Sequence, residues 1–164
     1  MIILLCGPIG AGKTSIAERL AEELEGSSVI SSDRFRRRVY DRLVREAEVR
    51  LGRARYIILD ATFYREAYRR RIMDLASRGE RVLTVFLDCP LEICLERNRR
   101  RGSPVPERAV KIIWREFERP EAPDIHIDTG NLSIDEAVRA ILGRLKHLEP
   151  DGGGPISPSG ESDR

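Results

Sequence analysis

The sequence contains no glutamine, only two asparagines, and only three lysines among its 29 basic residues. An excess of arginine with few thermolabile amides is typical of a GC-rich genome or of a thermophile. The 29 basic residues are nearly balanced by 27 acidic ones, which gives a net charge of +2. This balance excludes a polycationic protein, so RNA binding is possible but is not indicated by the net charge.

The chain also lacks a long apolar run and a recognisable leader. No stretch approaches the roughly 20 apolar residues that a membrane-spanning helix needs. The apolar segment at residues 2–6 leads directly into a glycine-rich loop and not into a cleavage site. We therefore expect a cytoplasmic protein with no membrane partner. The three cysteines have no metal-ligand spacing, and their odd number predicts small buried hydrophobic side chains.

The segment Gly7–Thr14 fits the pattern G-x-x-x-x-G-K-[ST] of a phosphate-binding loop. Glycines allow the backbone to curl and to direct its N–H groups at an anion, and the helix that follows adds a partial positive charge. Lys13 is a mobile cation that reaches the β- and γ-phosphates, and the hydroxyl of Thr14 is a suitable ligand for Mg²⁺. The loop therefore predicts binding of a nucleotide with Mg²⁺.

Short apolar runs alternate with segments of helical periodicity along the chain. This alternation predicts an α/β fold with a five-stranded parallel sheet covered by helices on both faces. The sequence Ser133–Glu136 predicts a capping box at the start of the last helix. The five predicted strands occupy residues 2–6, 28–31, 56–59, 82–87 and 125–127.

Carboxylates follow the second and third predicted strands, at the sheet edge where ligands bind. Asp33 is the candidate general base for an acceptor hydroxyl, and its alternative role is the N-cap of a helix that carries residues 35–47. Arg36 lies one helical turn further on and is expected to face the same space. Asp60 either steers Mg²⁺ through water or holds the acceptor, or else it is a turn residue.

An arginine pair marks a candidate lid. Arg97 and Arg101 are four residues apart, so they share a helix face, and the proline-containing connector at 102–106 follows them. This arrangement is typical of a mobile segment that brings arginines to transferred phosphates. The alternative is an exposed arginine-rich helix. Trp114 and Phe117 are expected in the core, and His126 is expected to be a structural histidine.

We assign residues 1–149 to one catalytic domain with a lid at about 97–118. Residues 150–164 consist of glycine, proline, serine and charged residues, and this composition predicts a disordered tail.

With these motifs, the chain resembles small P-loop kinases, of nucleoside-monophosphate-kinase-like fold, that are related to L-seryl-tRNA(Sec) kinase and to the 5′-kinase domain of polynucleotide kinase. The resemblance rests on Gly7–Thr14, on 32–36, on 60–64, and on 97–106 with the helix that follows. It implies transfer of the γ-phosphate of ATP to a hydroxyl acceptor: a nucleic-acid 5′-hydroxyl, an aminoacyl-tRNA or a small-molecule alcohol.

The resemblance also implies residue roles. Lys13, Asp33, Arg36 and Arg101 would be catalytic, and Thr14 would hold the metal. The acceptor would contact Asp33, Arg36, Asp60 and Thr62. The nucleotide would contact Gly7, Gly10, Ala11, Gly12, Lys13, Thr14, Ser15 and Arg97.

Two alternatives remain open at this point. Segments 88–92 and 121–129 are similar to adenylylsulfate kinase, which makes that activity the second candidate. The third is a nucleotide-binding switch or NTPase subunit without an acceptor, because Ala61–Phe63 replaces the Asp-Thr-Asn of the first two kinases.

Overall fold

A computed structural model describes residues 1–149; the predicted tail at 150–164 lies outside the described residues. The sheet has five strands in the order β2-β3-β1-β4-β5, and every neighbouring pair is parallel. The predicted five-stranded parallel sheet is therefore confirmed. The strands are β1 (Ile2–Cys6), β2 (Ser27–Ser31), β3 (Tyr56–Asp60), β4 (Val82–Asp88) and β5 (Ile125–Asp128).

The central strand β1 is buried on both faces. Because successive side chains of a strand point to opposite faces, Ile3 and Leu5 join one hydrophobic cluster while Ile2, Leu4 and Cys6 join the other. Two helix layers are needed to cover such a strand, and this explains its uninterrupted apolar sequence.

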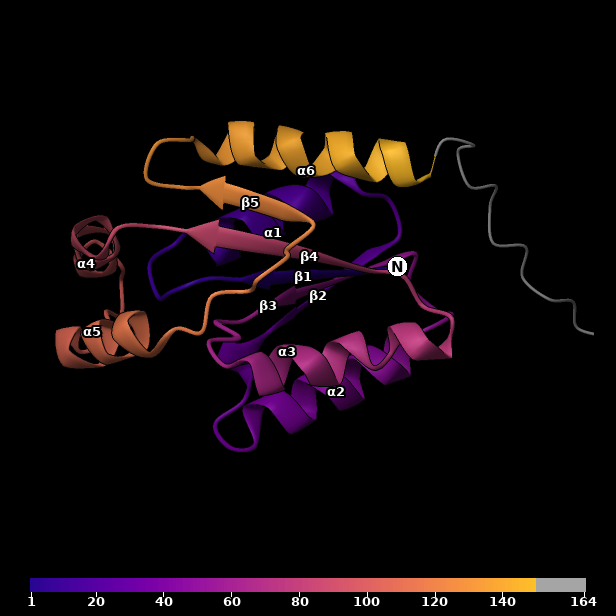
Figure 1. Ribbon diagram of the computed structural model, residues 1–164, viewed down its shortest axis with the longest axis horizontal. Coiled ribbons are helices and arrows are strands. Elements are labelled where there is room, and N and C mark those ends of the chain that lie inside the picture. The colour runs from indigo at the N-terminus through magenta and orange to yellow at the C-terminus, as the bar shows by residue number, and fades with distance from the viewer. Residues whose placement is uncertain (150–164) are drawn as a thin grey trace, which may run out of the picture.

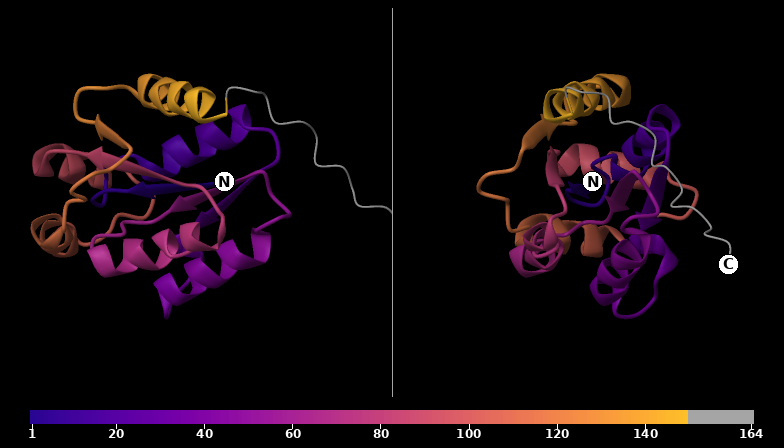
Figure 2. Two further views of the ribbon diagram at one scale, coloured as in Figure 1. Left: turned by 45° about the vertical axis from the view of Figure 1, so that its right-hand side comes forward. Right: turned by 90° about the vertical axis from the view of Figure 1, so that its right-hand side faces the viewer.

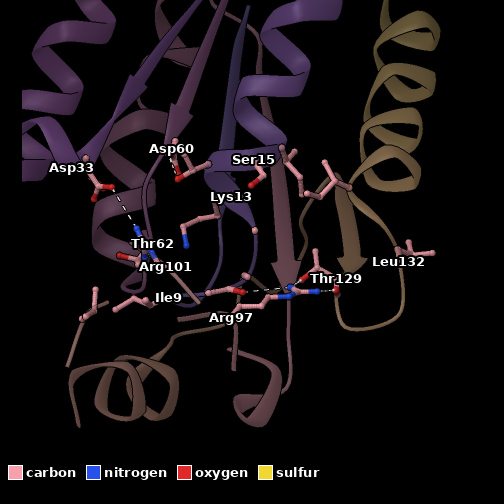
Figure 3. A pocket seen from close by; sticks show the side chains of 18 of the residues that line it. Ile9, Lys13, Ser15, Asp33, Asp60, Thr62, Arg97, Arg101, Thr129 and Leu132 are labelled. Atoms are coloured by element: carbon pink, nitrogen blue, oxygen red, sulfur yellow. Dashed lines mark hydrogen bonds and ion pairs between the residues drawn. The ribbon is translucent and has the colours of Figure 1, made fainter. Parts of the chain in front are cut away.

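The helices form these two layers. Figure 1 shows α1 (Lys13–Glu23) and α6 (Ile134–Leu148) on one face of the sheet, and α2 (Val39–Arg50) and α3 (Glu66–Met73) on the other. The two turned views in Figure 2 show the same separation. Two further helices, α4 (Leu91–Arg99) and α5 (Glu107–Glu116), lie beyond the carboxyl end of β4.

Local signals explain where α6 begins and where α2 differs from expectation. The capping box of α6 is confirmed, since Ser133 and Glu136 each accept from the other's backbone N–H at 3.2 and 2.8 Å. The expectation of a helix from residue 35 was wrong. A 3₁₀ turn covers Ser32–Arg34, the chain then bends, and α2 starts only after Arg38, which has a φ of +51°.

Two side chains at the carboxyl end of α5 are less buried than expected. Trp114 and Phe117 are only half-buried, because α5 packs beside the end of the sheet and not on its face. Trp114 nevertheless donates its indole N–H to the carbonyl of Cys89 at 2.9 Å. His126 is exposed, stacks on Phe86, and has its Nε2 3.1 Å from the Asp88 carboxylate.

Within residues 1–149, none of the helices has the length and hydrophobicity required to cross a bilayer. All three cysteines are buried and unpaired, as expected.

Candidate functional site

The Gly7–Thr14 loop connects the carboxyl end of β1 to the first residue of α1. Gly10 and Gly12 adopt φ values of +89° and +93°, which favour glycine because a Cβ is strained there. The N–H of Gly7 donates to the carbonyl of Thr62 at 3.1 Å, so the segment after β3 holds the start of the loop. The first turn of α1 contributes backbone N–H groups and the positive end of its dipole at the same point.

Lys13 is buried beneath this loop, although it is a charged residue. Its Nζ donates to the carbonyls of Gly7 and Pro8 at 2.9 and 2.8 Å. Burial lowers the pKa of Lys13 below its usual value, and the charge of Asp60 opposes this effect. Two loop carbonyls therefore hold the Lys13 ammonium at the centre of the loop.

Thr14 and Asp60 form an oxygen pair beside Lys13, in which only Asp60 is buried. The Thr14 hydroxyl donates to Oδ2 of Asp60 at 2.8 Å, and Asp60 is only 3% exposed. A hydroxyl next to a carboxylate is the donor set that Mg²⁺ takes up in phosphate-loop proteins. The residues therefore fit a magnesium ion that is bound together with a nucleotide. The sequence indicated Thr14 as the metal ligand and Asp60 as one candidate to steer Mg²⁺ through water, and the structure shows that the two side chains are direct partners.

A cavity of about 770 Å³ opens over the loop at the carboxyl edge of the sheet. Asp33 and Arg101 face each other across it, with an N–O distance of 3.8 Å between guanidinium and carboxylate. Asp33 comes from the turn after β2, whereas Arg101 follows α4. Asp33 does not cap α2, whose N-cap is Arg38. The structure thus places a carboxylate and an arginine from distant segments in the same space as Lys13.

Arg97 lines the cavity, and hydrogen bonds to two other segments fix its guanidinium. Its guanidinium donates to the carbonyls of Thr129 and Gly10 at 2.5 and 3.4 Å, and it lies 3.4 Å from the Thr129 hydroxyl. It also faces the buried thiol of Cys89, whose pKa falls to about 7, mainly through a hydrogen bond with Cys94 and then through the Arg97 charge. Arg97 therefore connects the phosphate loop to the segment after β5.

The connector after α4 is folded back on itself. The buried side chain of Asn98 donates to the carbonyl of Val105 at 2.7 Å and accepts from its N–H at 3.0 Å. This pair of bonds closes the loop that contains Arg101. Sequence reasoning gave Asn98 no role, because the side chain's partner lies seven residues away and no local pattern signals it.

The cavity also has an apolar wall that sequence analysis did not find. Ile9, Val105, Leu132 and Ile134 line it, and Leu132 and Ile134 are about two-fifths exposed. They come from three separate segments, so only the fold brings them together. An apolar wall next to a phosphate loop suits the flat face of a nucleobase.

Thr62 and Arg36 have different positions relative to this cavity. Thr62 lines the cavity, and its hydroxyl lies 2.9 Å from that of Tyr40. The next residue, Phe63, has a φ of +47° and is fully buried, with its carbonyl bonded to Arg69 at 2.6 Å. Arg36 is exposed in the bend before α2 and is not among the residues that line the cavity.

The comparisons with known proteins agree with this geometry. Residues 2–120 match the AAA_33 family, described as an AAA domain. The mouse L-seryl-tRNA(Sec) kinase is 35% identical over 61% of this chain, which spans 28% of the length of that relative. A probable adenylyl-sulfate kinase of Pyrococcus abyssi is 26% identical over 89% of this chain and 95% of its own length.

A solved structure supports the fold assignment. The adenylylsulfate kinase CysC of Mycobacterium tuberculosis, in complex with AMPPNP and APS, has a TM-score of 0.68 and 20% identity over 88% of this chain and 96% of that chain. The curated relatives reported above are named as kinases. The chain belongs to the AAA_33 family of AAA domains, and its fold is that of the P-loop kinases.

Proposed function

We propose that the protein is an ATP-dependent phosphotransferase that moves the γ-phosphate of ATP to a hydroxyl acceptor. One observation carries this proposal: Asp33, Arg101 and the phosphate-loop residues Lys13 and Thr14 line a single cavity. A nucleotide-binding protein without an acceptor needs the loop, but it does not need a carboxylate across the cavity from it.

The chain supplies a group for each requirement of the transfer. The loop amides and Lys13 bind the triphosphate, while Thr14 and Asp60 would hold Mg²⁺, which neutralises phosphate charge when bound. Asp33 accepts the proton of the acceptor hydroxyl. At the same time, the oxygen of that hydroxyl bonds to the γ-phosphorus and ADP leaves. Arg101 releases the Asp33 carboxylate and binds the transferred phosphoryl group. Its planar guanidinium stabilises the charge that develops there.

The acceptor is chosen from three classes: a nucleic-acid 5′-hydroxyl, an aminoacyl-tRNA or a small-molecule alcohol. Adenylylsulfate is the leading small-molecule candidate, because the archaeal relative named as a probable adenylyl-sulfate kinase matches over 95% of its own length. The mouse relative, by contrast, has most of its length outside the match.

The test is transfer of label from γ-labelled ATP to a panel containing RNA with a 5′-hydroxyl, seryl-tRNA, adenylylsulfate and simple alcohols. We expect one class to be phosphorylated, and Asp33→Asn to slow transfer by about 10²–10⁴-fold while ATP binding is retained. Hydrolysis alone across the panel, with Asp33→Asn as fast as the wild type, would instead indicate an NTPase or switch.

A further inference from the structure

Two of the three cysteines lie together at the start of α4. Pro90 is the N-cap of this helix, so Cys89 immediately precedes the cap and Cys94 is the fourth residue of the helix. Side chains at these two positions often pack against each other and fix the angle at which the chain enters a helix. Here both positions hold a free thiol, and both side chains belong to the same hydrophobic cluster.

The two thiols are in contact. Sγ of Cys94 lies 3.7 Å from the carbonyl oxygen of Cys89, and the two side chains are also hydrogen-bonded to each other. The same carbonyl accepts the indole N–H of Trp114 at 2.9 Å, which fixes the backbone of Cys89. Because the sulfurs are already neighbours, a bond between them requires no distant segment of the chain to move.

Cys89 also faces a cation, which a purely apolar packing role would not require. Nη1 of Arg97 lies 3.7 Å from Sγ of Cys89. The hydrogen bond with Cys94 is the main reason that the pKa of Cys89 falls to about 7. The Arg97 charge and the Thr129 hydroxyl act in the same direction, whereas burial and the Asp128 charge oppose them. A thiolate at neutral pH is the form of cysteine that reacts with oxidants.

Cys94 has the opposite protonation preference. The pKa of Cys94 is raised, mainly by the hydrogen bond that it makes with Cys89 and then by burial. Cys94 therefore keeps its proton while Cys89 is a thiolate. Conversion of Cys89 to a neutral sulfenic acid removes the negative charge that contributes to this raised pKa, so Cys94 becomes the better nucleophile after the first oxidation step.

The cavity gives a small oxidant a route to Cys89. Both thiols are buried, with exposed fractions of 1% for Cys89 and 0% for Cys94. Arg97 lines the cavity and contacts the Cys89 sulfur, so this side chain lies between the thiol and the space over the phosphate loop. A molecule as small as hydrogen peroxide reaches the sulfur once the Arg97 side chain moves, and a bound nucleotide would cover this route.

The geometry points to Cys89 as a site of peroxide modification, whose product is a Cys89–Cys94 disulfide that weakens nucleotide binding. The Cys89 thiolate attacks one peroxide oxygen and the O–O bond breaks, which leaves a sulfenic acid on Cys89. The hydroxide that departs takes up the proton that Cys89 had released. The Cys94 sulfur then attacks the Cys89 sulfur, the S–O bond breaks, and the Cys94 proton leaves with this hydroxide as a second water. Two thiols are thus oxidised to one disulfide while one hydrogen peroxide is reduced to two waters.

A disulfide at this position acts directly on the phosphate loop. Gly10 packs against the backbone of Cys94, since a Cβ on Gly10 would lie 2.5 Å from the Cys94 carbonyl oxygen. A disulfide bond is only about 2.05 Å long, so its formation draws Cys89 and the first turn of α4 closer together. It also removes the thiolate that Arg97 faces, while Arg97 itself donates to the Gly10 carbonyl at 3.4 Å. Both changes reach the loop that binds the phosphates.

The third cysteine provides an internal control. Cys6 ends β1 and belongs to the other hydrophobic cluster, so the sheet separates it from the pair. Burial raises the pKa of Cys6 to about 12, and its thiol donates to the carbonyl of Val85 at 3.6 Å. Cys6 is therefore as buried as the pair but has no thiolate character, and we expect it to stay reduced.

The first test treats the full chain with hydrogen peroxide and follows each thiol by alkylation and mass spectrometry. A protease that cleaves after glutamate separates Cys89 from Cys94 at Glu92, so the two fragments stay joined only through a disulfide. We expect the joined product to form, saturating ATP to slow its formation, and dithiothreitol to remove it, with Cys6 reduced throughout. A pair that stays reduced, or loss of all three thiols at the same rate, would overturn the inference.

Nucleotide binding is the second readout, measured with a fluorescent ATP analogue and Mg²⁺. The disulfide form should bind the analogue at least about fivefold more weakly than the reduced form, which is the lower end of the usual coupling between two sites. By linkage, ATP should favour the reduced pair by the same factor when the thiols equilibrate in a glutathione buffer. Equal affinities of the two forms would refute the coupling.

Alanine variants separate a specific modification from general oxidative damage. Cys89→Ala should bind the analogue with the same affinity before and after peroxide, and Cys94→Ala should form no joined product. Cys6→Ala is the matched control, because it also removes one buried thiol but should respond to peroxide as the wild type does. A wild-type response in Cys89→Ala would contradict the assignment of the site.

This inference uses only the nucleotide-binding step of the proposed kinase activity, and none of its readouts requires phosphoryl transfer. Absence of transfer to every acceptor would therefore reject the kinase proposal without affecting the assignment of the disulfide.

Discussion

Replacing Gly10 by alanine should destabilise the protein more than replacing Gly12, although both glycines have nearly the same backbone conformation. At each position the positive φ strains an alanine by about 1–2 kcal/mol. A Cβ on Gly12 would meet nothing within 4 Å, whereas a Cβ on Gly10 would lie 2.5 Å from the carbonyl oxygen of Cys94 and 2.9 Å from its Cα. These atoms belong to the backbone of α4 and cannot rotate away.

The overlap with α4 adds about 1–3 kcal/mol at Gly10, as is usual for overpacking against a rigid neighbour. For a domain of this size, 1 kcal/mol changes the melting temperature by about 2–4 °C. Gly10→Ala should therefore melt about 2–12 °C below Gly12→Ala. Gly102→Ala is the control, because that Cβ also meets nothing within 4 Å and the residue has no positive φ.

Urea unfolding monitored by circular dichroism, together with thermal melts, gives the comparison, with equal m values as the check on two-state behaviour. Displacement of α4 also moves Arg97, so Gly10→Ala should weaken ATP binding beyond the loss caused by Gly12→Ala. Equal stability of the two variants would mean that α4 does not approach the phosphate loop this closely in solution. The position assigned to Arg97, which α4 carries, would then also be wrong.

Three further substitutions give distinct expectations. Arg101→Ala should leave the melting temperature almost unchanged, because the ion pair of Arg101 with Asp33 is exposed and worth about 0–1 kcal/mol. The same substitution should lower kcat by at least about 10²-fold in the transfer assay. Asn98→Ala should cost about 2 kcal/mol in urea unfolding, since it removes both hydrogen bonds between this buried side chain and the backbone of Val105. A wild-type midpoint would refute the bracing role of Asn98. Gly143→Ala should raise the free energy of unfolding by about 1 kcal/mol, because it removes a glycine from the interior of α6 and the Cβ of the alanine meets nothing within 4 Å. Destabilisation would show that α6 packs more closely there.

Much of the fold is predictable from the sequence because its signals are local. Five short apolar runs separated by helical periodicity determine a parallel sheet, and the strand bounds agree to within one residue at each end. The glycine-rich loop defines its own conformation, so its position between β1 and α1 follows directly from the motif. Ser133 and Glu136 likewise satisfy each other within a single turn.

The site was only partly predictable, because its remaining contacts are long-range. The hydroxyl of Thr14 meets Asp60 across 46 residues, and Arg97 meets Thr129 across 32. The apolar wall depends on the loop before α6, whose Leu132 has no special sequence context. The bend at residues 35–38 was missed for the opposite reason. Arginines favour a helix locally, but here the chain has to turn from the edge of the sheet to α2.

The most direct test of the account is a crystal structure of the protein with a non-hydrolysable ATP analogue and Mg²⁺. We predict a triphosphate in the Gly7–Thr14 loop with Lys13 on its terminal oxygens, the metal at Thr14 and Asp60, and the Asp33 carboxylate facing the γ-phosphate with space for a hydroxyl between them. A nucleotide bound elsewhere, or Asp33 turned out of the cavity in that complex, would contradict the central claim that one cavity joins ATP binding to activation of an acceptor.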